Sequence, residues 1–152
     1  VRALGAAHEQ HEPEYIAYIH LEYSGGAIAH FHVNWLSPVK IRQMLVCGSQ
    51  KMVVFDDNNP SEKVRIYDKG VEFSPGDTDA FYKLRVDYRS GDMVAPKLDR
   101  TEALAAEVEH FVDCVRNRST PIADGRAGLA VVRILEAAQQ SLDADGEKVL
   151  LT

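Results

Sequence analysis

Three histidines near the start of the chain have the residue type and spacing of metal ligands. His30 and His32 are two residues apart, and this spacing can place two imidazoles of one strand on the same metal ion. His20 is expected to lie across from them on a neighbouring strand. No Asp, Glu or Cys accompanies the three histidines at a fixed spacing, so we predict no metal site and interpret them as part of a half-exposed sheet face.

Two basic residues, Lys40 and Arg42, flank the start of a predicted strand just beyond Pro38. Lysine offers a point charge and arginine a planar fork of donors, a combination that suits a phosphate or the hydroxyls of a sugar. Solvent-facing charges at a strand end are the alternative interpretation. The residues themselves leave both open, and we predict substrate contacts here.

The segment 71–100 contains two aromatic and two guanidinium side chains close together, namely Tyr82, Arg85, Tyr88 and Arg89. Aromatic rings stack on sugar faces or nucleobases, and guanidinium groups bind diphosphate. A long connection inside a compact domain is more often functional than idle. We therefore predict substrate-binding residues in this segment; the alternative is surface charge with the rings packed onto the core.

A hairpin is predicted to position the histidines. Residues 15–23 and 27–35 both alternate apolar and polar side chains, and Gly25-Gly26 supplies a tight turn between them. One face of this hairpin carries Tyr18 with the three histidines. The other face is apolar and ends at Trp35, which we expect in the core.

The remaining patterns predict strands first and helices afterwards. Further strands are expected at 1–7, 41–47, 51–55, 63–68, 83–88 and 147–151. Thr101 is expected to cap a helix that ends near Arg116, and Asp124 a second helix that stops at Gly146. The predicted fold is α+β: a largely antiparallel open sheet with two C-terminal helices packed on one face.

Length and composition indicate one ordinary domain over residues 1–152, with 45% hydrophobic residues. The net charge of −6 without a basic stripe argues against nucleic-acid binding, and no apolar run approaches the roughly 20 residues of a membrane span.

Cys47 and Cys114 lack metal-site or disulfide spacing, so we expect reduced thiols in a cytoplasmic protein. The chain begins at Val1 rather than Met, which suggests a processed or truncated piece.

Three motifs in order resemble a known family. They are Asn-Trp-Leu-Ser-Pro-Val-Lys-Ile-Arg at 34–42 with Val-Cys-Gly-Ser at 46–49, Tyr-Arg-Ser-Gly-Asp at 88–92 with Glu-Val-Glu-His-Phe at 107–111, and Asp-Gly-Arg-Ala-Gly-Leu at 124–129. Together they resemble the C-terminal domain of the glucose–fructose oxidoreductase and inositol dehydrogenase family (Gfo/Idh/MocA). The closest likeness is to members that oxidise nucleotide-activated sugars at C3. Ala103 departs from the family, where proline often follows the glutamate.

The resemblance implies an NAD or NADP cofactor, held in the full-length protein by an N-terminal Rossmann domain with a catalytic Glu-Lys-Pro motif. This chain has neither that motif nor a Gly-rich loop between a strand and a helix. We therefore expect it to bind no cofactor, to hold no catalytic residue and to be inactive alone. It would serve as the substrate-binding and oligomerisation domain of a sugar or nucleotide-sugar oxidoreductase.

The resemblance also implies that the sheet packs face to face with the sheet of another subunit. In this chain the contact would be made by the side that bears Tyr18, His20, His30 and His32, giving a homo-oligomer. The alternative function is a non-catalytic protein-interaction module that binds a partner protein through the same open face.

Overall fold

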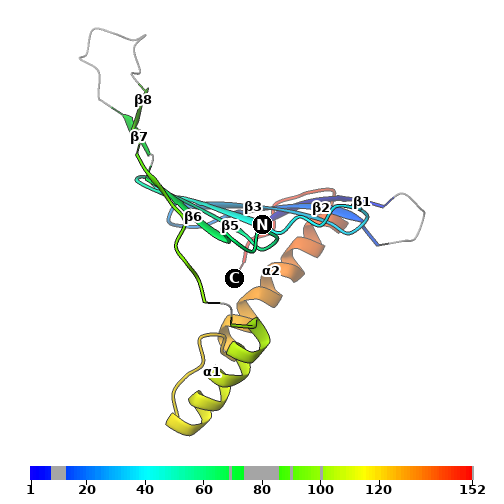
Figure 1. Cartoon of the computed structure of the whole chain (residues 1–152). Helices are drawn as coiled ribbons and strands as arrows, with labels where there is room; N and C mark the ends of the chain where they lie inside the picture. Colours follow the sequence, from blue (N-terminus) through cyan, green and yellow to red (C-terminus); the bar gives the residue numbers. More distant parts are fainter. Residues whose placement is uncertain (8–12, 69, 74–85, 90, 100, 152) are drawn as a thin grey trace. The chain divides into compact units, whose positions relative to one another are not determined.

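The computed structural model describes residues 1–7, 13–68, 70–73, 86–89, 91–99 and 101–151, with the backbone alone in 70–73 and 86–89 (Figure 1). The chain divides into two compact units. The first consists of Val1–Pro38 and Thr101–Thr152, and the second of Val39–Arg100. A single domain over 1–152 stays a prediction.

The first unit contains a three-stranded antiparallel sheet with the order β1 (Arg2–Ala6), β2 (Ile16–Glu22) and β3 (Ile28–Asn34). The predicted hairpin is confirmed, since β2 pairs with β3 along its whole length. Gly26 has a φ of 81° in the turn, a conformation that glycine adopts without steric cost.

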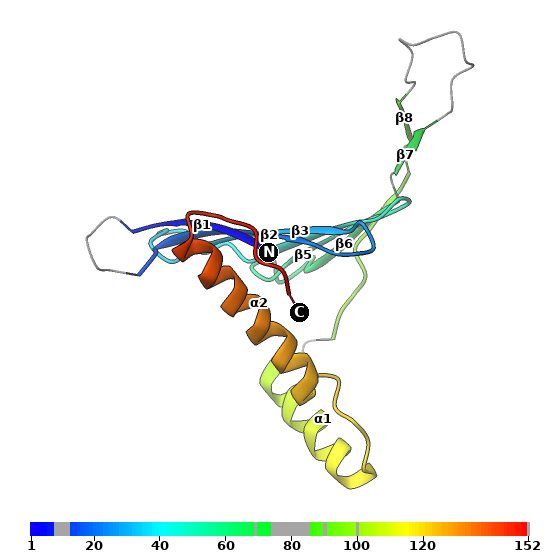
Figure 2. The ribbon, with the colours of Figure 1, turned by 180° about the vertical axis from the view of Figure 1, so that it is seen from behind.

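Two helices follow in the same unit, α1 (Ala103–Asn117) and α2 (Gly125–Asp143). Figure 2 shows the C-terminal half of α2 against the sheet at β1. Small residues permit this close approach: Ala137 and Ala138 of α2 are buried together with Ala3 and Leu21 of the sheet. The core of the unit therefore lies between α2 and one face of the sheet.

Ser141 ties this core together, because it is fully buried and its hydroxyl makes two hydrogen bonds. The Ser141 Oγ accepts from the Ala3 N–H at 2.9 Å and donates to the Glu147 carbonyl at 2.6 Å. Burying a hydroxyl without partners is costly. Here it joins α2, β1 and the segment after the helix.

The two helix starts test the cap predictions. Asp124 is confirmed as the cap of α2, since its carboxylate accepts the Ala127 N–H at 2.8 Å. The prediction of Thr101 as cap of α1 is wrong. Glu102 takes this place, and its carboxylate accepts from the N–H groups of Leu104 and Ala105 at 3.1 and 2.7 Å, which satisfies two donors rather than one.

The second unit contains a four-stranded antiparallel sheet and a two-stranded hairpin. The sheet has the order β4 (Gln43–Cys47), β5 (Met52–Asp56), β6 (Val64–Tyr67) and β9 (Met93–Val94), and β7 (Gly70–Phe73) pairs with β8 (Val86–Arg89). The register places only apolar side chains on one face of the sheet: Met44, Val46, Val53, Phe55, Val64, Ile66 and Val94. The opposite face is mixed.

The predicted α+β class with open antiparallel strands and C-terminal helices is confirmed, although the strands lie in separate sheets. The predicted final strand at 147–151 is wrong. That segment is irregular and pairs with Val1 through two hydrogen bonds at Val149, of 2.8 and 2.9 Å. Trp35 is also not in the core, since it is 69% exposed. No helix among the described residues is long and apolar enough to cross a membrane.

Candidate functional site

The structure brings the four predicted interface residues onto one side of the first unit's sheet. His20 is directly opposite His30, and Tyr18 is directly opposite His32. The rings of His20 and His30 are 4.7 Å apart and tilted, and those of Tyr18 and His32 stack at 4.6 Å. We call these four residues the histidine face. It lies on the side of the sheet away from α2, because side chains alternate along each strand.

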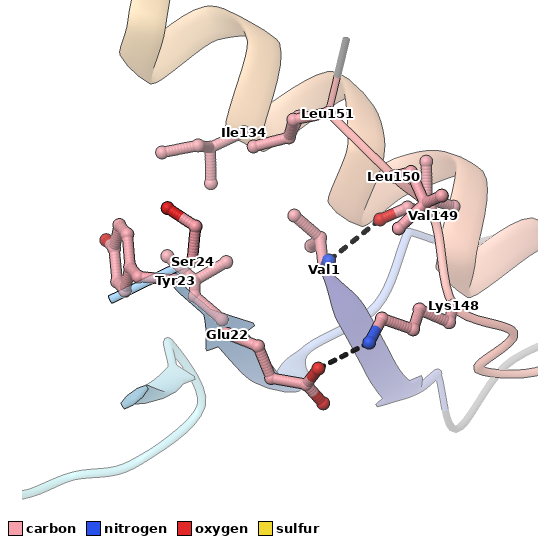
Figure 3. Close-up of a pocket in the computed structure, with 10 residues that line it drawn as sticks. Val1, Glu22, Tyr23, Ser24, Ile134, Lys148, Val149, Leu150 and Leu151 are labelled. Carbon is pink, nitrogen blue, oxygen red and sulfur yellow. Dashed lines mark hydrogen bonds and ion pairs between the residues drawn. The ribbon is translucent and has the colours of Figure 1, made fainter. Parts of the chain in front are cut away.

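An ion pair borders this face. Glu22 lies two residues beyond His20 and binds Lys148 of the C-terminal segment (Figure 3). The Glu22 carboxylate is also 3.4 Å from His20 Nε2. Hydrogen bonding and charge from Lys148, with a smaller contribution from His20, lower the pKa of Glu22 below its ordinary value of 4.5. Glu22 is therefore a stable negative charge beside the imidazoles.

The other ring nitrogen of His20, Nδ1, is shielded from solvent and has no hydrogen-bond partner among the described residues. No group of three or more His, Cys, Asp and Glu side chains that could hold a metal ion occurs in the described part of the chain. The geometry thus offers a histidine-rich surface with one polar atom unsatisfied.

The second unit holds a compact cluster of opposite charges at the end of its four-stranded sheet where β4 begins and β5 ends. Asp57 accepts from Lys63 Nζ at 2.8 Å and lies 3.5 Å from the Arg42 guanidinium. Lys63, and to a smaller degree Arg42, lower the pKa of Asp57 below its ordinary value of 3.8. Arg42 keeps 64% of its side chain exposed, so its guanidinium can reach a ligand as well as Asp57.

The backbone of Lys40 lies beside this cluster. The Asn58 side chain donates to the Lys40 carbonyl at 2.6 Å, and the Asp57 N–H donates to the Arg42 carbonyl at 2.9 Å. These two bonds hold the segment before β4 against the turn after β5. The two basic residues named from the sequence, Lys40 and Arg42, therefore lie in one hydrogen-bonded corner of the second unit, which we call the basic corner.

Of the other predicted substrate residues, Tyr82 and Arg85 lie outside the described residues. Tyr88 and Arg89 belong to β8, where the backbone of Tyr88 is opposite Val71 and that of Arg89 opposite Gly70. The predicted strand at 83–88 corresponds to β8, which begins at Val86.

A hollow that the sequence patterns did not indicate lies in the first unit, where the two ends of the chain meet. It encloses about 340 Å³. Figure 3 shows Ile134, Leu151 and Val1 around it, with the hydroxyl-bearing Tyr23 and Ser24 on one side. Because its lining joins residues far apart in the sequence, no local pattern could have revealed it. We assign no function to this hollow.

His110 of α1 contacts the connection between the two helices. Its Nε2 accepts the Ile122 N–H at 3.2 Å and lies 3.6 Å from the sulfur of the buried Cys114. These contacts hold the connection between α1 and α2 against α1. Sequence spacing could place His110 and Cys114 on one helix face, but not the bond to Ile122.

The open antiparallel sheets and the two C-terminal helices define an α+β domain. The chain belongs to the oxidoreductase family with a C-terminal alpha/beta domain known as Gfo/Idh/MocA, whose family model matches residues 1–151. No curated protein matches the chain.

Two solved structures share the fold, both of UDP-N-acetylglucosamine 3-dehydrogenase GnnA from Acidithiobacillus ferrooxidans. They superpose with TM-scores of 0.68 and 0.64 at 20% and 22% identity, and each match covers 95% of this chain. The chain spans 40% of the length of those proteins. The likeness therefore concerns the fold of one part of a longer enzyme.

Proposed function

We propose that this chain is the substrate-binding and oligomerisation domain of an NAD(P)-dependent sugar or nucleotide-sugar oxidoreductase. The observation that carries the proposal is the family match over residues 1–151. The shared fold with a sugar-nucleotide dehydrogenase supports the nucleotide-sugar class. Hydride chemistry in such enzymes belongs to the nicotinamide cofactor, and the protein supplies binding and orientation.

The described residues do not fit the cofactor itself. A dinucleotide is held by its pyrophosphate at a helix N-terminus that follows a Gly-rich turn. Both helix N-termini here are already capped by carboxylates, Glu102 on α1 and Asp124 on α2. A negative side chain at this position repels a pyrophosphate, so we expect no NAD(P) binding and no dehydrogenase activity from this chain alone.

The substrate would be held by basic and aromatic residues of the second unit: Lys40, Arg42, Tyr82, Arg85, Tyr88 and Arg89. The support for Arg42 is its exposed guanidinium beside Asp57, a partner at 3.5 Å that a diphosphate can replace. Charge-assisted bonds from arginine to phosphate are strong and often bidentate. Lys40 would add a second charge to the same corner.

The test is the affinity of this chain for UDP-N-acetylglucosamine, measured by ligand-observed NMR titration. Arg42→Gln should weaken binding by about threefold to tenfold, because one charge-assisted contact is lost. Asp57→Asn should leave binding equal or stronger, since it breaks the same ion pair but keeps the guanidinium. Arg133→Gln on α2 is the matched control. Equal affinities of the Arg42 and Arg133 variants would contradict the role of Arg42, and no binding by the unaltered chain would contradict the proposed function.

The histidine face would pack against the same face of a second copy. Three exposed apolar side chains on this side of the sheet support a contact surface: Leu4 at 61%, Tyr18 at 55% and Ile28 at 63% exposure. A two-fold contact uses the same patch on both copies. Aromatic side chains on such a patch are typical of interfaces.

Two new carboxylates on this face should separate the copies. We expect the variant with His30→Glu and His32→Glu to sediment as a monomer at neutral pH, because like charges would oppose each other across the two-fold axis. The matched control places carboxylates on exposed positions of α2, Gln139→Glu and Gln140→Glu, and should remain associated. A histidine-face variant that stays fully associated would exclude this interface and favour another surface.

A further inference from the structure

We propose that protonation of the histidine face controls the self-association of the chain, so that copies associate when the imidazoles are neutral and separate when they are charged. The inference rests on the proposed function, because it assumes that this face is the contact surface. It assigns to the face a pH-dependent regulation that follows from the arrangement of its charges.

The first step is the row of basic groups across the sheet. Arg2 of β1 is directly opposite His20 of β2, and His20 is directly opposite His30 of β3. Directly opposed side chains on one face are close neighbours, and like charges in these positions destabilise each other. Arginine side chains carry a positive charge at all relevant pH values. Protonation would turn this row from one positive charge into three.

The next row across the sheet carries no charge when its histidine is neutral. Leu4 of β1, Tyr18 of β2 and His32 of β3 are opposite one another. The stacked rings of Tyr18 and His32, with an interplanar angle of 11°, form a flat surface beside the exposed Leu4. A neutral row of this kind suits a contact with a second copy. A charged His32 would have to be desolvated in that contact without a counterion, which is unfavourable.

The third step is the supply of counterions. Among the described residues, Arg2 is directly opposite His20, and Glu22 and Lys148 form an ion pair beside it. Glu22 is the carboxylate, and it is already shared between His20 and Lys148. No ion pair of His30 or His32 occurs among the described residues, and a proton at the shielded His20 Nδ1 would lack an acceptor. One carboxylate cannot offset three imidazolium groups and two permanent cations.

Symmetry doubles this effect, because a two-fold contact brings the same charges from each copy. Histidine is the side chain that ordinarily changes its charge between pH 5 and 8. Charges close together in an interface of reduced dielectric repel more strongly than in water. A modest fall in pH is therefore expected to change the face from a contact surface to a repelling one.

The test is sedimentation velocity of the full chain at about pH 8 and about pH 5.5 at constant ionic strength, a range that spans histidine titration. We expect an oligomer at the higher pH and a dissociation constant at least about tenfold larger at the lower pH. Far-UV circular dichroism at both values checks that the fold persists. The ion pairs of Glu22 and Asp57 should persist at pH 5.5, because the pKa values of both carboxyls lie below 4.5 and 3.8 respectively.

The matched variant replaces His20, His30 and His32 by glutamine, which keeps polar amide groups but cannot gain a proton. It should remain associated at both pH values. Equal association of the unaltered chain at both values would overturn this inference and leave the proposed interface intact. A glutamine variant that still dissociates in acid would also overturn it. A monomer at both values would remove the interface itself, and with it the inference.

Discussion

The two sheets of this chain differ in how their apolar side chains are buried. In the first unit, α2 lies on one face of β1–β3, and six of the buried hydrophobic residues belong to this unit: Val1, Ala3, Leu21, Cys114, Ala137 and Ala138. In the second unit only Val54 reaches this degree of burial among the described residues. No helix of the described part of the chain belongs to the second unit.

This difference shows that strand pairing alone does not make a core. The four-stranded sheet has a face of seven apolar side chains, yet Met44, Val46 and Val94 remain 55–59% exposed. Apolar burial is the main favourable contribution to folding. We infer that the unit with the histidine face is held by its own packing, whereas the unit with the basic corner is held mainly by backbone pairing.

The largest expected effect is a difference in stability between truncations of a buried strand side chain in each of the two units. Leu21→Ala should cost roughly 2–5 kcal/mol, because it leaves a cavity beneath α2. Val54→Ala should cost only about 1–2 kcal/mol, since fewer carbon atoms are removed from a less buried site. Native-state hydrogen exchange measures each unit separately. Equal costs would show that the second unit has a core of comparable quality.

A smaller effect is expected from the surface charges, and it should be the same in both units. The pKa values of Glu22 and Asp57 are lowered in the folded chain, so their ion pairs stabilise it above the ordinary values of 4.5 and 3.8. This stabilisation disappears as the pH falls through the lowered folded-state pKa values.

Glu22→Gln and Asp57→Asn should therefore each lower the thermal unfolding midpoint slightly at pH 7, because exposed pairs contribute little. The difference from the unaltered chain should vanish at strongly acidic pH. Thermal melts at both pH values measure this, with Asp113→Asn as a control on an exposed helix face. A large loss in only one unit would mean that its charges compensate for poor packing.

Local patterns predicted most elements of the two units, but not β7 or β9. The alternation around Gly25-Gly26 predicted β2, β3 and the side of the sheet on which His20 and His30 meet. Asp124 was predicted as a cap because aspartate is a favoured capping residue. In the structure its carboxylate accepts the N–H group three residues later. These features depend on residues close together in the sequence, and period-two alternation fixes their orientation.

Features that depend on distant residues could not be predicted. The bond from the Ala3 N–H to Ser141 joins residues 138 positions apart, and the hollow beside Tyr23 is formed by both ends of the chain. Trp35 continues the apolar face of β3, but α2 packs against β1 and leaves it exposed. The ion pair of Arg42 with Asp57 likewise depends on a turn after another strand. The basic corner was predicted from residue types, but its partner Asp57 was not.

The most direct test of the account is to map where UDP-N-acetylglucosamine binds, by following the backbone amide resonances of the labelled chain during titration. We expect shifts that gather in the second unit around Lys40 and Arg42 and in the segment that contains Tyr88 and Arg89, while the resonances of the histidine face stay unchanged. Shifts at Tyr18, His20, His30 and His32 without shifts at Arg42 would contradict it, because the substrate would then occupy the surface assigned to a second copy.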